Sequence, residues 1–190
     1  MLCIVPPRQE DRKMLRPEDQ IRKLAAFTSV ILMATAEALA QDKSARPTHR
    51  IVVSIADRKL AVLADDRVVR IFPTAVGAPQ SPSPAGVYKI VNSIPDPTWY
   101  YKGKVIGPGK NNPLGTRWLG LSIKGYGIHG TNVPSSIGHN ASHGCVRMRN
   151  KDVEELFRMV DVGDQVEIYA DRTAELDQIF GDPTAIVAAQ

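Results

Sequence analysis

The segment IGHNASHGCVRM, residues 137–148, places a cysteine among histidines. Cys145 follows His143 by two residues and His139 by six, while His129 lies sixteen residues upstream of the cysteine. A thiol beside an imidazole base can perform nucleophilic acyl transfer. The same four side chains could instead bind zinc, or they could be ordinary surface and core residues. The chemistry depends on which of them meet in the folded protein.

Nucleophilic catalysis is the interpretation that the spacing favours. The pattern H-x9-H-x3-H-x-C does not have closely spaced ligand pairs on both sides, as a structural zinc site does, and no G-x-S-x-G elbow indicates a serine enzyme. A free cysteine, with a pKa of about 8.5, is mostly protonated at neutral pH. We therefore expect a nearby imidazolium and a helix N-terminus to lower the pKa of Cys145. Gly144, which lacks a Cβ, permits a tight turn whose amides can face a substrate carbonyl.

The N-terminal region has the pattern of an export signal. Arg22 and Lys23 precede an apolar run of thirteen residues, 24–36, and an A-x-A sequence follows. The run is too short for a comfortable membrane-spanning helix, which needs about 20 residues. We expect residues 1–40 to be a signal peptide, with translation starting at the first residue or at Met14. The mature protein would then lie in the periplasm or cell envelope without an integral membrane span.

The number of cysteines and the net charge restrict the classes of function that the sequence allows. Cys3, the only other cysteine, lies in the predicted signal peptide, so the mature chain would carry a single thiol into an oxidising compartment. A lone thiol there is exposed to oxidation, which is easier to understand if Cys145 has a function. The net charge of +4, without a basic run, argues against nucleic acid as a partner.

Strand patterns dominate the chain after a polar linker at residues 41–48. Segments rich in β-branched or alternating apolar residues predict strands at 50–56, 60–63, 68–76, 87–91, 118–123, 127–129 and 165–169. After the histidine-rich loop we expect one helix, with Asn150 as its cap and an apolar face made of Val153, Leu156, Phe157 and Val160. Residues 170–190 suggest a weak helix and a tail. The sequence therefore predicts a mainly β domain with one helix against the sheet.

A long irregular stretch, residues 93–115, interrupts these elements. Proline and glycine are frequent in it, and Trp99, Tyr100 and Tyr101 stand together. A loop of this length in a compact domain is usually functional or disordered, and three adjacent aromatic residues argue against disorder. We expect this stretch to form a flap or the wall of a groove.

These motifs together resemble the L,D-transpeptidase catalytic domain, also called the YkuD domain. The similar segments are, in order, SPSPAGVYKI at 81–90, NNPLGTRWLGLS at 111–122, IHGT at 128–131 and SHGCVRM at 142–148. The family pattern also places a histidine upstream of [S/T]-H-G-C, as His129 stands here. The resemblance covers residues 49–169, and it implies a β-sandwich-like fold with one helix following the catalytic loop.

The resemblance implies cysteine acyl transfer on the stem peptides of peptidoglycan, without a cofactor. Cys145 would attack the diaminopimelate carbonyl of a tetrapeptide stem and release the terminal D-alanine. An amine on a second stem, giving a 3-3 cross-link, or on a wall-anchored lipoprotein would then accept the acyl group. Two alternatives stay open: hydrolysis of the same bonds by an L,D-carboxypeptidase or endopeptidase, and a non-catalytic module that binds the wall.

The resemblance also implies roles for individual residues. His129 would be the general base and acid, oriented by a backbone carbonyl such as that of Gly130. The residues that would shape the oxyanion hole or support the loop are Gly130, Ser142, His143, Gly144 and Arg147. Arg147 would either brace the loop or meet a stem carboxylate. We place the substrate groove at Trp99, Tyr100, Asn112 and Tyr126. His139 matches no catalytic position of the family, so we interpret it as a loop residue.

Overall fold

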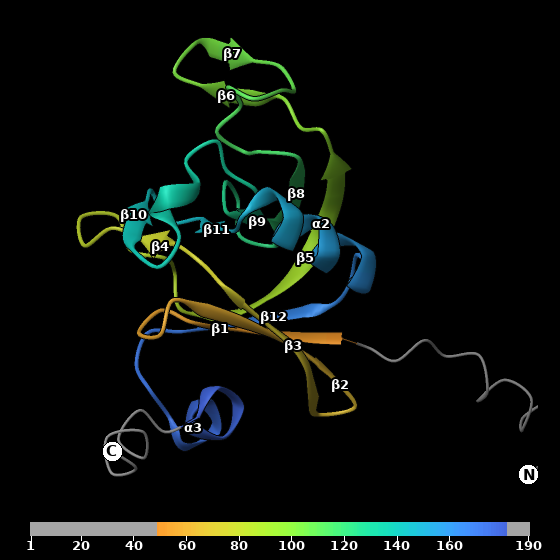
Figure 1. Cartoon of the computed structure of the whole chain (residues 1–190), viewed down its shortest axis with the longest axis vertical. Coiled ribbons are helices and arrows are strands. Elements are labelled where there is room, and N and C mark those ends of the chain that lie inside the picture. The colour runs from red at the N-terminus through yellow and green to blue at the C-terminus, as the bar shows by residue number, and fades with distance from the viewer. Residues whose placement is uncertain (1–48, 182–190) are drawn as a thin grey trace, which may run out of the picture. The chain divides into compact units, whose positions relative to one another are not determined.

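Twelve strands and two α-helices make up residues 49–181, the part of the chain that the computed structural model describes (Figure 1). The strands are β1 (His49–Ser54), β2 (Lys59–Ala64), β3 (Arg67–Pro73), β4 (Val76–Gly77), β5 (Gly86–Pro95), β6 (Trp99–Tyr101), β7 (Lys104–Ile106), β8 (Arg117–Leu121), β9 (Gly127–His129), β10 (Asn140–Ser142), β11 (Val146–Arg147) and β12 (Gln165–Tyr169). The helices are α2 (Asn150–Met159) and α3 (Ala174–Phe180). The predicted signal peptide and linker, residues 1–48, lie outside the described residues.

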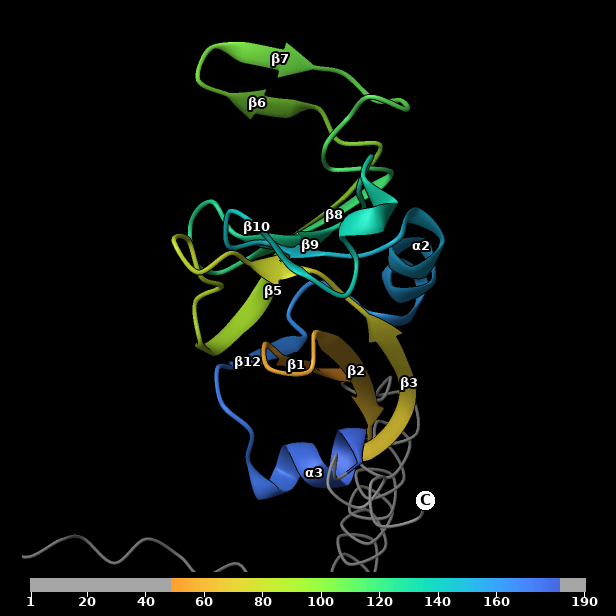
Figure 2. The ribbon, with the colours of Figure 1, turned by 60° about the vertical axis from the view of Figure 1, so that its left-hand side comes forward.

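Eight of these strands form one mixed sheet in the order β11-β9-β8-β5-β12-β1-β2-β3. The long strand β5 belongs to both halves of the sheet. The first residues of β5 pair with β12, and its later residues pair with β8. The register shifts between Ile90 and Asn92, and such an irregularity bends and twists a strand. The sheet therefore curls, and its two halves enclose a common core (Figures 1 and 2).

Apolar side chains from both halves of the sheet and from α2 meet in this core. Its fully buried members include Ile51, Leu60, Leu119, Ile128, Met148 and Leu156. Each such side chain contributes about 1.5–3 kcal/mol when it is removed from water. The mainly β, sandwich-like fold predicted from the sequence is confirmed. The short strands β6, β7, β10 and β11 were not expected, because two or three residues are too few to show a period.

The two helices belong to separate apolar clusters: α2 lies against β8 and β9 and joins the core, and α3 lies against the outer face of β2. Alternate side chains of a strand point to opposite faces, so Ile51 and Leu60 join the core beside α2 while Val52 and Leu63 pack against α3. The predicted apolar face of α2 is confirmed, since its core-facing residues are Val153, Leu156, Phe157 and Val160. Within residues 49–181, neither helix is long and apolar enough to cross a membrane.

The structure corrects the predicted role of Asn150 as a helix cap. Arg149 takes the N-cap position of α2, and no side chain accepts a capping hydrogen bond there. The Oδ1 atom of Asn150 instead accepts a hydrogen bond from the Thr131 amide at 3.0 Å. The side chain thus ties the start of α2 to the loop that follows β9.

The irregular stretch 93–115 contains a hairpin. After the end of β5, strands β6 and β7 pair and stand away from the large sheet (Figure 2). Asn112 closes the base of this segment, because its Nδ2 donates to the Pro97 carbonyl at 2.6 Å and its Oδ1 accepts from the Leu114 amide at 2.8 Å. A buried carboxamide therefore takes the place of regular backbone pairing at the base of the hairpin.

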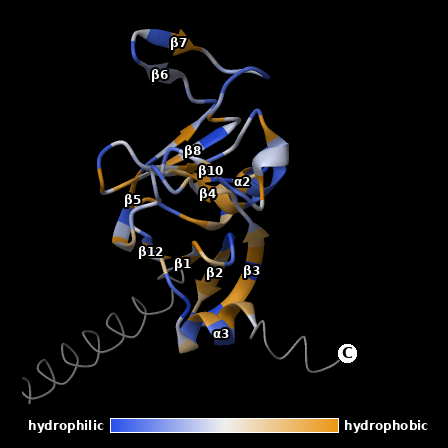
Figure 3. Ribbon diagram, turned by 90° about the vertical axis from the view of Figure 1, so that its left-hand side faces the viewer, coloured by the Kyte–Doolittle hydropathy of each residue, from blue (hydrophilic) through white to orange (hydrophobic). Residues whose placement is uncertain are grey.

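Helix α3 covers hydrophobic residues on the outer face of β1 and β2 (Figure 3). Leu176 is fully buried there in a small cluster with Val52, Ala61 and Leu63. Glu175 pairs with Arg50 at 2.7 Å, and Arg172 pairs with Asp57. The helix is thus held by an apolar contact and by ion pairs to the strands, although the sequence pattern of this region is weak.

We predict that Leu176→Ala lowers the free energy of unfolding by about 2–5 kcal/mol, because it leaves a cavity in the cluster under α3. Denaturant titration followed by circular dichroism measures the change. Gln178→Ala, on the exposed side of the same helix, is the matched control and should change stability by less than about 0.5 kcal/mol. Equal stabilities of the two variants would show that α3 does not contribute to the fold.

Candidate active site

A cavity of about 920 Å³ lies between the β6–β7 hairpin and the strands β8, β9 and β11. One wall is aromatic and includes Trp99, Tyr100 and Tyr101. The opposite wall carries the chemical groups His129, His143, Cys145 and Arg147. The fold therefore gathers in one cavity Trp99 and Arg147, which are 48 positions apart in the chain.

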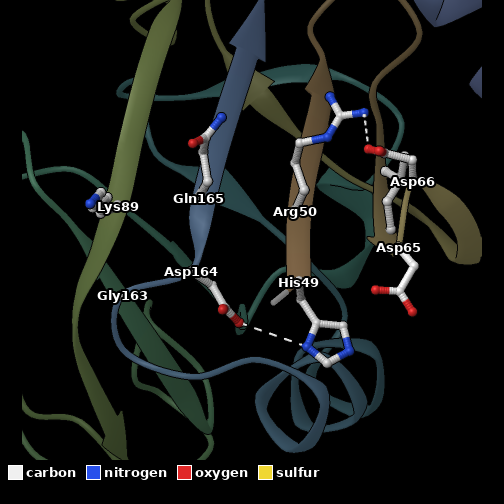
Figure 4. Close-up of a pocket in the computed structure, with 9 residues that line it drawn as sticks. His49, Arg50, Asp65, Asp66, Lys89, Gly163, Asp164 and Gln165 are labelled. Atoms are coloured by element: carbon white, nitrogen blue, oxygen red, sulfur yellow. Dashed lines mark ion pairs between the residues drawn. The ribbon is translucent and has the colours of Figure 1, made fainter. Parts of the chain in front are cut away.

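A second cavity, of about 490 Å³, lies at β1, β5 and β12 (Figure 4). Figure 4 shows charged side chains directed toward one another: His49 Nδ1 is 3.9 Å from Asp164 Oδ2, and Arg50 Nη2 is 3.5 Å from Asp66 Oδ1. No cysteine or serine lines this cavity. The groups that can perform acyl transfer are in the first cavity.

Parallel pairing of β9 with β11 places the base and the nucleophile on one face. Val146 pairs with Ile128, and Arg147 pairs with His129. Alternate residues of a strand point the same way, so Cys145, directly before β11, shares a face with Arg147 and His129. Val146 and Ile128 point the other way, into the core.

The imidazole of His129 is buried, with 4% of its surface exposed, and is held from two sides. Its Nδ1 lies 2.6 Å from the Gly130 carbonyl oxygen, and the ring of Trp118 stacks on it at 5.7 Å between centroids. A carbonyl oxygen can only accept, so Nδ1 carries the proton and Nε2 keeps its lone pair. Burial lowers the pKa of His129 to about 4, while the Gly130 hydrogen bond acts in the opposite direction. The ring is a neutral base at physiological pH.

The thiol of Cys145 is partly buried beside β9. Its Sγ lies 3.7 Å from the Gly125 carbonyl oxygen. Burial raises the pKa of the thiol, and the Gly127 amide and the charge of Arg147 lower it by less. The expectation of a lowered pKa is therefore wrong, because burial of the thiol outweighs the Gly127 hydrogen bond and the charge of Arg147. The resting site holds a neutral thiol and a neutral imidazole.

The turn that presents Cys145 is closed by Ser142. The Ser142 hydroxyl donates to the Cys145 carbonyl at 2.6 Å and accepts from the Gly144 amide at 3.0 Å. Gly144 has a φ of 106°, and a Cβ there would lie 2.6 Å from the Tyr126 ring, so the turn requires glycine. Within residues 49–181, the amides of His143 and Cys145 have no hydrogen-bond partner. These two amides are available to a substrate oxygen.

Arg147 brings an unpaired positive charge to the cavity wall. None of the carboxylates in the described part of the chain pairs with it, whereas acidic partners are present for Arg50, Arg70, Arg117, Arg149 and Arg172. Burial lowers the pKa of Arg147 from its ordinary value, but a guanidinium remains charged in proteins. The cavity therefore contains a cation without a counter-ion from this domain.

Two of the four predicted groove residues line the cavity. Trp99 and Tyr100 do so, and Tyr100 is 72% exposed. Asn112 and Tyr126 are not among the residues that line it. Asn112 is fully buried and its carboxamide is used at the base of the hairpin, and the Tyr126 ring lies against Gly144 in the turn that presents Cys145.

Three of the four residues of the zinc alternative, His129, His143 and Cys145, line the cavity, but they are not grouped as metal ligands. Among residues 49–181, no three His, Cys, Asp or Glu side chains are grouped so that they could hold a metal ion. His139 is exposed and lies outside the cavity lining, and its carbonyl accepts from the Val76 amide at 3.2 Å. The arrangement leaves the thiol and the His129 imidazole as the reactive pair.

Sequence reasoning missed Trp118, which stacks on the His129 ring. Trp118 is the antiparallel partner of His129 in the β8–β9 ladder, and its Nε1 donates to Asn92 Oδ1 at 3.0 Å. The pairing register of two predicted strands, 118–123 and 127–129, could have indicated the contact between Trp118 and His129. A short turn between them leaves few ways to pair, and one of these sets Trp118 opposite His129.

Known proteins are similar to this chain over the described domain. YkuD of Bacillus licheniformis is 43% identical over 120 residues, which are 63% of this chain and 65% of that protein. YqjB of Bacillus subtilis is 34% identical over 145 residues, 74% of this chain and 81% of that protein. The names of both assign them to the L,D-transpeptidases. The chain thus spans less than two thirds of the length of YkuD but most of YqjB.

Solved structures share the fold. An L,D-transpeptidase from Mycobacterium smegmatis superimposes with a TM-score of 0.56 at 21% identity, covering 65% of this chain and 59% of that one. The Enterococcus faecium L,D-transpeptidase gives a TM-score of 0.55 at 25% identity, covering 65% and 50%. The model of the L,D-transpeptidase catalytic domain, YkuD, matches residues 48–168, which contain every group of the cavity discussed above. The chain therefore belongs to the YkuD family of L,D-transpeptidase catalytic domains.

Proposed function

We propose that this protein is an exported peptidoglycan L,D-transpeptidase. The observation that carries the proposal is the placement of Cys145 and His129 in one cavity, with the imidazole fixed as a neutral base. Family membership supports the substrate class. A module that only binds the wall would need neither a nucleophile nor a base of fixed tautomer.

The first half-reaction forms a thioester. As the Sγ of Cys145 attacks the carbonyl carbon between diaminopimelate and D-alanine, the Nε2 of His129 takes the thiol proton. The C–N bond then breaks, and the imidazolium gives the proton to the leaving amine. D-Alanine departs, and the diaminopimelate acyl group remains on the sulfur.

The second half-reaction transfers this acyl group to an amine. His129 takes a proton as the amine attacks the thioester carbonyl, the C–S bond breaks, and the imidazolium returns a proton to the sulfur. A second stem as acceptor gives a 3-3 cross-link, and an anchored lipoprotein gives attachment to the wall. Each half-reaction starts from a neutral imidazole, which is the state that burial favours in this site.

Backbone amides would stabilise the oxyanion of both tetrahedral intermediates. The His143 and Cys145 amides are the candidate donors, and a single donor of this kind is worth about 10²–10³ in kcat. Ser142 and Gly144 support them indirectly, because their mutual hydrogen bond fixes the turn. The turn is thus arranged before substrate arrives, so little reorganisation is needed during reaction.

Arg147 and the aromatic wall would bind the stem peptide. The stem carries free carboxylates, and the unpaired guanidinium of Arg147 offers a charge-assisted partner for one of them. Trp99 and Tyr100 would cover the peptide from the hairpin side. We assign the carboxylate role to Arg147 in preference to bracing of the loop, because no side chain of residues 49–181 holds its guanidinium.

Peptidoglycan lies outside the cytoplasm, so the proposed activity requires export. Residues 1–40 carry the signal-peptide pattern of a basic flank, an apolar core and an A-x-A ending. We propose that the enzyme works in the periplasm or cell envelope after this segment has been removed.

Product analysis tests the proposed function. The purified protein is incubated with a disaccharide-tetrapeptide, and the products are followed by mass spectrometry. We expect loss of D-alanine together with dimer formation. Loss of D-alanine without dimers would instead identify an L,D-carboxypeptidase, and an unchanged substrate would contradict the proposal. Cys145→Ala should abolish both products.

Alanine variants of His129 and His139 compare a proposed catalytic histidine with one that lies outside the cavity. We predict that His129→Ala lowers kcat by about 10²–10⁴, because the general base and acid is lost. His139→Ala should stay within about twofold of the parent activity, because His139 is exposed and outside the cavity. Similar losses in the two variants would contradict the assignment of the base.

The pH dependence of thiol alkylation tests the neutral thiol–imidazole pair. Burial raises the pKa of Cys145, so the thiolate fraction falls below that of a free thiol near neutral pH and increases as the pH rises. We predict that the rate of Cys145 alkylation by iodoacetamide rises about tenfold per pH unit from pH ~6 to ~8. The same chain unfolded in urea should react faster at pH ~7, because its thiol has the ordinary pKa of about 8.5.

Peptide mass spectrometry measures the alkylation of Cys145 specifically, on the peptide that contains this residue. A thiolate–imidazolium pair would give a different result, with a rate that stays level from pH ~5 to ~8 because the thiolate is already formed. A level profile would therefore contradict the neutral pair.

The proposed carboxylate contact of Arg147 can be tested with two substrates. We predict that Arg147→Gln raises KM by about 10–100-fold for a stem with free carboxylates, from the loss of a charged hydrogen bond. Amidation of the stem carboxylate that contacts Arg147 should weaken binding of the stem to the parent protein. The same amidation should have little further effect on binding to Arg147→Gln. Arg149→Gln, whose side chain pairs with Asp152 outside the cavity, is the matched control. Independent, additive effects of Arg147→Gln and of amidation would exclude direct contact.

A further inference from the structure

One peptide unit holds the imidazole of His129, and a side chain outside the cavity holds that peptide. The Gly130 carbonyl accepts the Nδ1–H of His129 at 2.6 Å. The amide of the same peptide, on Thr131, donates to Oδ1 of Asn150 at 3.0 Å. The carbonyl and N–H of a planar trans peptide point in opposite directions, so the unit connects Asn150 on one side with His129 on the other.

Neighbouring backbone groups of the same loop are fixed by the sheet. The His129 carbonyl accepts from the Met148 amide at 2.8 Å, and the Gly130 amide donates to the Arg117 carbonyl at 3.2 Å. The Thr131 amide, in contrast, is held by a side chain. Asn150 is thus the group that fixes the plane of the peptide on which the imidazole depends.

Two glycines create the space that the Asn150 carboxamide occupies. A Cβ placed on Gly115 would come within 2.1 Å of Asn150 Oδ1, and one on Gly130 within 2.2 Å. Both distances are far below a normal contact, so the oxygen is confined between two backbone segments. This close fit leaves it little freedom to turn away from the Thr131 amide.

Helix formation does not account for this geometry. Arg149, not Asn150, is the N-cap of α2, and the carboxamide is directed at a loop nineteen residues earlier in the chain. A peptide whose N–H is hydrogen-bonded is polarised, and its carbonyl becomes a better acceptor. The same bond can therefore both orient the Gly130 carbonyl and strengthen its hold on Nδ1–H.

We infer that Asn150 is a positioning residue for His129, acting through the Gly130–Thr131 peptide to keep Nδ1 protonated and Nε2 directed into the cavity. The inferred tautomer and orientation of the His129 ring depend only on the hydrogen bonds. The expected effect on kcat rests in addition on the proposed function. The Gly130 carbonyl here takes the place that the carboxylate has in a Ser-His-Asp triad, and Asn150 holds the peptide that carries it.

The experiment compares Asn150→Ala, Asn150→Asp and the parent protein, with Lys151→Ala as the control on the exposed surface of the same helical turn. Nitrogen NMR of the histidine side chains reports the tautomer of His129 without any substrate. We expect the parent and Asn150→Asp to show the Nδ1–H tautomer, because both keep an oxygen acceptor for the Thr131 amide. Asn150→Ala should show a mixture of tautomers, and Lys151→Ala should match the parent.

Kinetics with the disaccharide-tetrapeptide give the second readout. Asn150→Ala should lower kcat by about 10²-fold with KM nearly unchanged, since a small misplacement of a catalytic group has an effect of this size. Asn150→Asp should recover most of this loss. A folded Asn150→Ala protein with the parent tautomer and kcat would overturn the inference, as would an Asn150→Asp protein that behaves like Asn150→Ala.

A second variant covers the case in which Asn150→Ala does not fold. Gly130→Ala leaves residue 150 in place but pushes its Oδ1 away from the Thr131 amide. It should produce the mixed tautomers expected of Asn150→Ala, and a parent-like His129 spectrum in this variant would refute the inference. If the tautomer changes as expected but the parent protein transfers no acyl group, the proposed function fails while the positioning role stands.

Discussion

The hydrogen bond from the Nδ1–H of His129 to the Gly130 carbonyl is the interaction that the rest of the site depends on. It selects one tautomer and leaves the Nε2 lone pair for the thiol. The strands β8 and β9 supply the backbone around it, and Trp118 covers the ring. The catalytic turn, closed by Ser142, then needs only to deliver Cys145 to the face on which the imidazole already lies.

Burial determines the electrostatic character of this pair. It lowers the pKa of His129 and raises that of Cys145, and both shifts favour the uncharged forms. A neutral thiol reacts slowly with oxidants because the thiolate is the reactive species. In the proposed oxidising compartment, burial would therefore protect the nucleophile until a bound substrate makes proton transfer to His129 productive. Arg147 leaves a positive charge nearby, where a substrate carboxylate can neutralise it.

Different parts of the fold provide its stability and carry the groups of the candidate active site. The core is enclosed by the curled sheet and α2, and α3 protects the outer face of β1 and β2. The cavity lies at the opposite end, below a hairpin that is anchored by the carboxamide of Asn112. Two asparagines, the buried Asn112 and the half-buried Asn150, thus use their side chains to fix loops where the backbone has no regular partners.

The sequence by itself determined the longer strands, the apolar face of α2 and the identity of the candidate nucleophile and base, because these follow from local periodicity and from a motif of fixed spacing. Only the tertiary structure decided the direction of the Cys145 pKa, since burial depends on groups that surround the thiol in space. It also buried the Asn112 carboxamide at the base of the hairpin and gave Asn150 a partner nineteen residues away. A side-chain amide has the same local preferences in a cap, a groove or a buried anchor, so long-range contacts alone select among these roles.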